Sequence, residues 1–253
     1  MSIDNFGTRF LKPGMTVLAS VIDYGALVMT LDVWNSVGSP GTTPATMLVW
    51  QQAQAKLDNN LAPRDGERTA ILNPDAMAAT VDGLKTLFQD GDAIADQYRS
   101  GVMKRAIDLK WAIDQNIRNI TTGTHTGTIS VSTPLPATGD SFIRVDWTSG
   151  GDTNTFTKGE VFTVASVFAV NQETKQTLNY LQQFVVTTAA TGASSIATLS
   201  VSPTLYTSSS GGLQNISALP ADNASVTFYG TTASTVYPQN LVFHKDAFTF
   251  ATA

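Results

Sequence analysis

The sequence contains no cysteine and only two histidines, His125 and His244, among its 253 residues. The absence of cysteine excludes disulfides, iron–sulfur clusters, zinc sites with thiolate ligands and thiol catalysis. Metal sites and Ser-His-Asp triads bring several ligands or partners together, and two isolated histidines do not supply them. A structural or surface role is therefore expected for each histidine, and the sequence predicts no metal site, no cofactor and no catalytic residue.

Charge is also scarce, because only 14% of the residues are charged, against about 25% in average soluble proteins. The formal net charge is −5. Proteins dedicated to nucleic-acid binding gain affinity from Lys and Arg at phosphates, so this composition argues against that class and leaves only contact through a local patch. Apolar residues make up 42% of the chain, which is enough for a folded core and excludes a disordered protein.

Three acidic residues, Asp90, Asp92 and Asp96, lie close together but do not form a calcium loop. Ile94 stands where that loop needs an oxygen ligand. The glycine-rich segments lack the Lys-Ser/Thr ending of a phosphate-binding loop. Neither pattern predicts a ligand site.

The most apolar stretch, residues 15–31, is predicted to be a helix buried in the core. It contains Asp23 and has 17 residues, which is short for a membrane span. The residues before it carry Asp4 against Arg9 and do not resemble the basic start of a signal peptide. No membrane association is expected.

Composition changes near Gly123, and this change divides the chain. Residues 1–124 hold 11 of the 15 basic and 13 of the 20 acidic residues, whereas the remainder is rich in Thr, Ser and Gly. Periodicity and turn residues predict helices in the first part, at residues 13–31, 43–61 and 75–88, and strands at residues 68–72 and 107–114. The second part alternates with period two between turn residues, which predicts strands at 128–132, 142–147, 161–164, 184–188, 196–201 and 225–229. Such a series indicates a small antiparallel barrel or sandwich, and residues 240–251 are predicted to return as a strand to the first part.

Several segments occur in a consistent order along most of the chain: YRSG at 98–101, DLKWAIDQNI at 108–117, TTG at 121–123, KGEVFT at 158–163, QQFVV at 182–186 and QNLVFHKDAF at 239–248. Together with residues 44–61, 68–74 and 170–175, this ordered set resembles the major coat proteins of tailed phages of the podovirus type.

The resemblance implies an α+β protein with part of the tailed-phage capsid fold. A helix-rich capsid body at residues 1–124, completed by a return strand at 237–253, is interrupted by an all-β, immunoglobulin-like (telokin-like) barrel at 125–236. The implied function is that of a structural coat subunit, not an enzyme, that assembles into an icosahedral shell around double-stranded DNA. The implied partners are other copies of the coat protein, scaffolding and portal proteins and non-specifically contacted DNA, with assembly in the bacterial cytoplasm and a final location in the virion.

Two further expectations concern contacts between subunits. The loop at residues 148–154, with Asp152 and Asn154, is predicted to contact a neighbouring subunit, because it is a polar loop on a domain of low charge. Members of the resembled family also have a long N-terminal arm, an extended loop and further elements after the equivalent of Phe250. Their absence predicts a truncated chain that does not close shells by itself.

Two alternatives remain open at this point. Thr/Ser-rich strands and Trp147 beside a polar loop are compatible with a secreted or surface-displayed carbohydrate-binding module. Asp146 and Asp152 are the one pair of carboxylates that could serve in glycoside hydrolysis.

Overall fold

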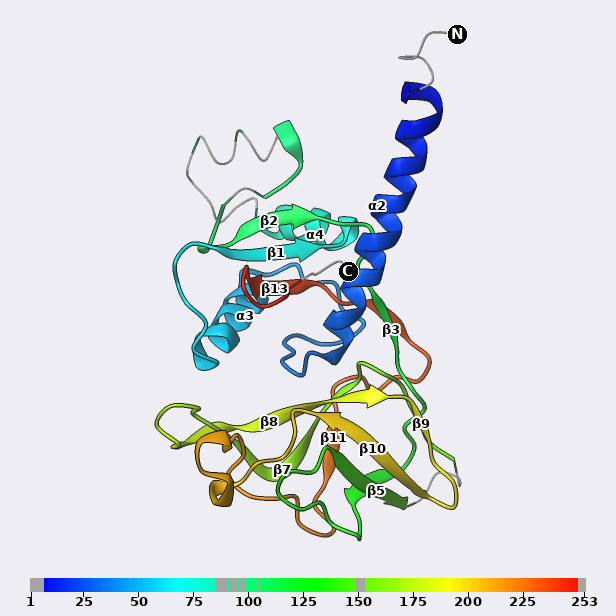
Figure 1. The fold of residues 1–253 in the computed structure, drawn as a ribbon, viewed down its shortest axis with the longest axis vertical. Helices are drawn as coiled ribbons and strands as arrows, with labels where there is room; N and C mark the ends of the chain where they lie inside the picture. The colour runs from blue at the N-terminus through cyan, green and yellow to red at the C-terminus, as the bar shows by residue number, and fades with distance from the viewer. Residues whose placement is uncertain are drawn as a thin grey trace.

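The structure is a computed structural model that describes residues 7–84, 91, 95, 99–103, 105–148 and 153–249. The chain has an α+β fold with two β-rich parts (Figure 1). A small sheet with two helices lies at one end, and a larger, almost closed barrel lies at the other. A long N-terminal helix extends away from both (Figure 1).

The small sheet joins two strands from the first half of the chain to its last strand. Strand β1 (Arg68–Leu72) is central; it pairs in parallel with β2 (Lys110–Ile113) and antiparallel with β13 (Leu241–His244). The register of β13 places His244 opposite Arg68 and Leu241 opposite Ile71. The predicted return of the last strand to the first part of the chain is therefore present.

Helices α3 (Met47–Asn59) and α4 (Pro74–Leu84) pack with this sheet. The core between them contains Trp50, Ala70, Leu72, Ala76, Met77, Met103 and Leu109. Trp50 meets Trp111 edge-to-face, with ring centroids 5.1 Å apart, a geometry that aromatic pairs prefer. Residues 85–88, which belong to the third predicted helix, lie outside the described residues.

The barrel is a six-stranded sheet in the order β11-β7-β8-β10-β5-β4. Its strands are β4 (Thr128–Val131), β5 (Phe142–Thr148), β7 (Val161–Val170), β8 (Thr177–Thr188), β10 (Ile196–Ser202) and β11 (Val226–Phe228). The two edges approach each other through a bridge between Ser130 and Ser225 and a 2.9 Å hydrogen bond from Val131 N–H to the Ala224 carbonyl. This closure removes the open edges of the sheet.

Alternating side chains fill the barrel. In β5, for example, Ile143, Val145 and Trp147 are buried, while the residues between them are partly exposed. The same interior contains four phenylalanine rings, those of Phe156, Phe162, Phe184 and Phe228. Because every second residue of these strands faces the interior, the sequence shows the period of two that predicts strands. All six predicted strands of this part are confirmed, although β7 and β8 are longer than predicted.

Two short strand pairs and one 3₁₀ segment complete the described fold. Strand β3 (Asn119–Thr121) pairs with β12 (Val236–Pro238), and β6 (Thr155–Phe156) pairs with β9 (Ala190–Thr191). A 3₁₀ segment, η3, covers Ser208–Leu213. In the β3–β12 pair, the segments by which the chain enters and leaves the barrel lie side by side (Figure 1).

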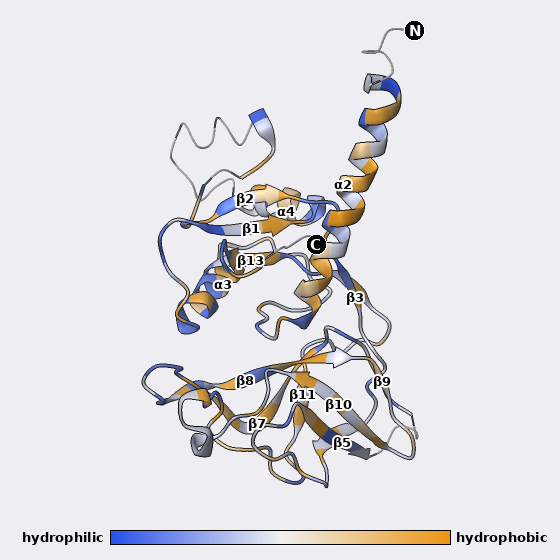
Figure 2. Cartoon of the chain, viewed as in Figure 1, coloured by the Kyte–Doolittle hydropathy of each residue, from blue (hydrophilic) through white to orange (hydrophobic). Residues whose placement is uncertain are grey.

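The prediction of a buried N-terminal helix is wrong. Residues Gly7–Leu11 form a π-helical turn, η1, followed by helix α2 (Lys12–Ala26) and the 3₁₀ segment η2 (Leu27–Asp32). No residue of α2 is buried, and Figure 2 shows that this projecting helix carries many hydrophobic residues. Gly7–Asp32 is also long and apolar enough to cross a membrane, but core helices and signal sequences pass the same test of length and composition.

Candidate functional site

Of the loop predicted to contact a neighbouring subunit, Thr148 and the residues from 153 onwards are described. Asp152 lies outside the described residues. Asn154 is fully buried: its Oδ1 accepts hydrogen bonds from the N–H and the hydroxyl of Thr126, at 3.0 and 2.8 Å, and its Nδ2 donates to the Thr126 carbonyl at 3.0 Å. The Asn154 side chain thus braces the segment before β4, and contact between this loop and a second subunit remains a prediction.

The best-defined polar site in this part of the molecule is where the chain enters and leaves the barrel. We call it the joint; it consists of residues 121–125, residues 232–237 and Glu160. Thr122, which is buried, donates its hydroxyl to the Thr232 carbonyl at 2.5 Å and accepts the N–H of Thr235 at 2.9 Å. The backbone N–H of Thr122 donates to the Thr235 carbonyl at 3.0 Å. These bonds tie the incoming and outgoing segments together.

Glu160 is the buried anion of the joint, with 2% of its surface exposed. One carboxylate oxygen accepts the Gly123 N–H at 2.7 Å, and the other accepts the Thr157 N–H at 2.6 Å. His125 Nε2 lies 3.4 Å from the Glu160 Oε1 atom. A buried carboxylate is tolerated where such donors replace water, so Glu160 stabilises the path of the chain into the barrel.

The rings of His125 and Tyr237 complete the surroundings of the Glu160 carboxylate. The His125 ring packs against Phe228, with centroids 4.2 Å apart, and against Phe156 at 5.3 Å. Burial and the nearby Glu160 charge raise the pKa of Tyr237 to about 12. Both effects disfavour a second negative charge at the joint.

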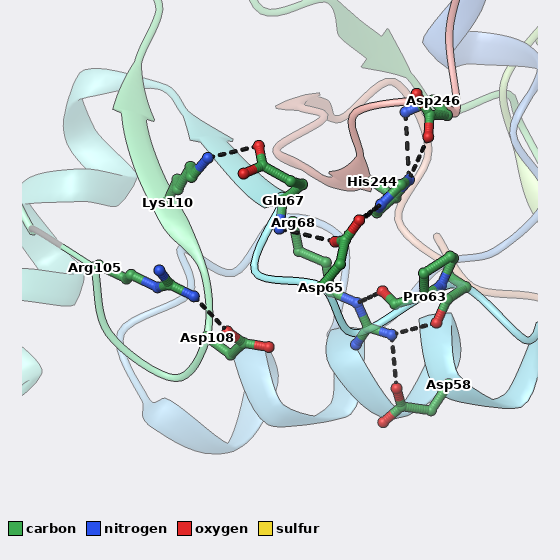
Figure 3. Close-up of polar contacts among 11 residues, drawn as sticks. Asp58, Pro63, Asp65, Glu67, Arg68, Arg105, Asp108, Lys110, His244 and Asp246 are labelled. Atoms are coloured by element: carbon green, nitrogen blue, oxygen red, sulfur yellow. Dashed lines mark hydrogen bonds and ion pairs between the residues drawn. The ribbon is translucent and has the colours of Figure 1, made fainter.

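A second polar cluster holds the returning strand to the start of β1 (Figure 3). His244 Nδ1 accepts the Asp246 N–H at 3.3 Å, which places the proton on Nε2, where it donates to the Asp65 carboxylate at 3.1 Å. Hydrogen bonds from the Glu67 N–H and from His244 lower the pKa of Asp65. The expected structural role of His244 agrees with this arrangement.

Arg68 lies beside this cluster and is completely buried. Its guanidinium donates to the Pro63 and Ala62 carbonyls and, from Nη2, to Asp58 Oδ1 at 2.8 Å (Figure 3). Asp58 also accepts two hydrogen bonds from Arg64, at 2.6 and 2.9 Å, and these arginine contacts lower its pKa to about 2. The cluster fixes the end of α3 to the first strand of the sheet.

A cavity of about 1230 Å³ opens between α3, residues 33–46 and residues 236–248. Its walls include Trp50, Ala53, Leu57, Leu241 and Phe243. The lining is mostly carbon, so the space suits an apolar occupant rather than a charged substrate.

Most of the remaining chemical candidates lie outside the described residues. Asp146 lies on β5 and accepts the Ser130 hydroxyl at 2.8 Å across the ladder, while its proposed partner Asp152, like Asp90, Asp92 and Asp96, lies outside the described residues. Among the residues that the structure does describe, no group of three or more His, Asp or Glu side chains is placed to hold a metal ion. Trp147 is 4% exposed within the barrel core, so the ring on which the carbohydrate-binding alternative depended is not available to stack on a sugar.

Solved structures similar to this chain include the following two. One is named "CUS-3 coat protein I-domain" and shares 22% identity, covering 41% of this chain and 96% of that chain with a TM-score of 0.30. The other is named "Mycobacterium phage Che8" and shares 13% identity, covering 91% of this chain and 68% of that chain with a TM-score of 0.37. No family model matches the sequence. No curated protein matches it either.

Proposed function

We propose that the chain is a coat subunit of a tailed phage, which self-associates into an icosahedral capsid enclosing double-stranded DNA. In this proposal residues 1–124 and 237–253 form the capsid body and residues 125–236 form an inserted, immunoglobulin-like barrel domain. Scaffolding and portal proteins, assembly in the host cytoplasm and non-specific contact with DNA belong to the same proposal. The ordered sequence resemblance to podovirus-type coat proteins supports it.

The observation that carries the proposal is the pairing of β13 with β1. Arg68 and His244 are opposite each other in the small sheet although most of the chain, including the whole barrel, lies between them in sequence. That topology is the one expected of a body domain interrupted by an insertion. The joint supports it as well, because the incoming and outgoing segments are held together at one buried point.

Electron microscopy tests the proposal directly. The complete gene is expressed in bacteria together with the genes that flank it, and the lysate is examined for shells by negative staining and sedimentation. Shells containing this protein are expected. Well-folded protein that stays small under these conditions would contradict a coat function.

A matched pair of variants links the assay to the sheet. Ala70 is completely buried and faces Val242 of β13, so Ala70→Asp is expected to prevent the return strand from docking and to abolish shells. Ala55, on the exposed side of α3, provides the control Ala55→Asp, for which shells are expected. If both variants formed shells, assembly would not depend on the β1–β13 pairing.

A further inference from the structure

Helix α2 is held to the rest of the chain by its polar side. Asp23 accepts a 2.8 Å hydrogen bond from the Asn116 side chain, and the Ser20 hydroxyl lies 3.3 Å from the Asn116 Nδ2 atom. The Arg118 guanidinium stacks over the Tyr24 ring, 3.9 Å from its centroid. When a helix packs on its own protein, its apolar stripe normally faces the core. In α2 the polar side faces the rest of the chain instead.

The apolar side of α2 is consequently exposed. Leu11, the last residue of η1, and Met15, Leu18 and Ile22 of α2 follow a four-three-four spacing that places them on one stripe, and each is between 46% and 65% exposed. Val17 and Val21 widen the stripe and are 64% and 63% exposed. An apolar surface of this extent on a folded protein marks a contact with another molecule.

Two glycines, Gly14 and Gly25, lie on the same stripe and contact no other part of the described chain. A Cβ atom added to Gly14 or Gly25 would meet no atom of the described residues within 4 Å, and neither residue needs a positive φ. Glycine within a helix costs about 1 kcal/mol relative to alanine. It leaves room for a side chain of a neighbouring helix to approach closely.

We propose that α2 pairs antiparallel with α2 of a second copy across a two-fold axis near Leu18. In this register Leu11 lies over Gly25 of the other helix, because both are seven residues from Leu18. Ile22 lies over Gly14, because both are four residues away. The contact is self-complementary, as a two-fold interface requires. One short helix from each copy forms the contact, which is small beside an interface of standard size, so the pair is weak in isolation.

Charge favours a second copy over a lipid surface as the occupant. Helices that lie on membranes carry Lys and Arg along their polar face. Residues 7–32 carry only Arg9 and Lys12, balanced by Asp23 and Asp32, in a chain of net charge −5. This pairing rests on the proposed function, because it would be one of the contacts by which coat subunits associate.

Cysteine cross-linking tests the register, and the absence of native cysteine makes the result unambiguous. Under mild oxidation Leu18→Cys is expected to give a disulfide-linked dimer, since the two residues face each other at the axis. Leu11→Cys alone is expected to stay monomeric, because its two copies are separated by roughly 21 Å at about 1.5 Å per residue. The double variant Leu11→Cys with Gly25→Cys is expected to restore the dimer. Thr16→Cys, on the polar side, is the matched negative control.

A further variant separates pairing from folding. Gly25→Leu has open space in the single chain and removes a helix-destabilising residue, so it is expected to preserve or raise stability. It fills the room needed by Leu11 and is expected to lower the Leu18→Cys dimer yield at least fivefold.

Each remaining outcome has a defined meaning. Cross-linking of Leu11→Cys or Thr16→Cys by itself, or no dimer from Leu18→Cys, would overturn the antiparallel pair. Flotation of the wild-type chain with phosphatidylcholine–phosphatidylglycerol vesicles, without Leu18→Cys dimers, would assign the face to lipid instead. Shells without α2 dimers would support the coat function and reject the pairing of α2. Dimers of α2 without shells would support the pairing and contradict the coat function.

Discussion

The backbone N–H of Gly123 donates a 2.7 Å hydrogen bond to Glu160, a carboxylate that is almost completely buried. Gly123 is where the chain passes from the small sheet into the barrel, and Glu160 directly precedes β7. A second donor, the Thr157 N–H, occupies the other carboxylate oxygen. The entry of the chain into the barrel therefore depends on one acidic side chain.

Glu160→Ala is expected to destabilise the protein by about 2–6 kcal/mol, because the buried Gly123 N–H and the partly buried Thr157 N–H lose their acceptor at about 1–3 kcal/mol each. Glu160→Gln keeps one acceptor oxygen and is expected to lose less. Urea unfolding followed by circular dichroism measures both values. Glu173→Ala, at an exposed turn, is the control; an equal loss in that variant would remove the special role of Glu160.

Gly123→Ala tests the same point by steric means. A Cβ atom at this position would lie 1.9 Å from the Thr155 carbonyl oxygen and 3.2 Å from Phe156 Cα, and backbone atoms cannot move aside cheaply. We expect a loss of more than about 2 kcal/mol, or failure to fold. Gly212→Ala meets no atom within 4 Å and should leave the melting temperature nearly unchanged. Normal stability of Gly123→Ala would show that the entry segment is loosely held.

Acid sensitivity is predicted from Asp58. Its pKa is lowered from 3.8 to about 2 by Arg64 and Arg68, so it contributes stability above pH 4 that is lost as the pH falls from about 4 to 2. Its side chain is 37% exposed, so solvent screening keeps this contribution modest. The difference in unfolding free energy between wild type and Asp58→Asn should be largest above pH 4 and shrink towards pH 2. A difference that is independent of pH would show that the Asp58 charge is not what stabilises the cluster.

Local pattern was sufficient for most strands but not for their full length. β5 and β10 alternate between turn residues and occur as predicted. β7 was predicted to end at Val164, yet it continues to Val170 past Ser166, which has a φ of 65°. The register with β8 shifts there and pairing resumes at Phe168, so pairing with β8 continues the strand past a residue whose backbone interrupts it.

Other features depend on which distant residues come together. The alternation over residues 107–114 predicts a strand of that length, but Ile107 and Asp108 have positive φ values and turn the chain before β2. The sequence of α2 shows an amphipathic pattern, but this pattern does not determine which side of the helix faces the rest of the protein. Asn116 and Arg118, about a hundred residues away, decide that. Glu160 stands between the Lys158-Gly159 turn and an apolar strand, and in the sequence it contributes only to the family resemblance, because a single acidic residue there is a weak signal of burial.

The loop at residues 148–154 yields the last prediction, in which two neighbouring polar residues have different roles. Asn154→Ala leaves the Thr126 N–H and carbonyl without their buried partner, and we expect it to destabilise the isolated chain by about 1–3 kcal/mol. Asp152→Lys reverses a charge in the loop proposed to contact a neighbouring subunit. We expect it to leave the unfolding free energy within about 0.5 kcal/mol of wild type and to reduce shell yield in the co-expression assay.

Measuring both quantities for both variants separates folding from assembly. Asn154→Ala shells, once formed at low temperature, should be as abundant as wild-type shells per folded subunit, because the Asn154 side chain is fully buried and bonded within its own chain. Unchanged shell yield and stability in Asp152→Lys would argue that this loop makes no contact between subunits. The self-association surface would then have to lie elsewhere, and the exposed apolar side of α2 is the candidate proposed above.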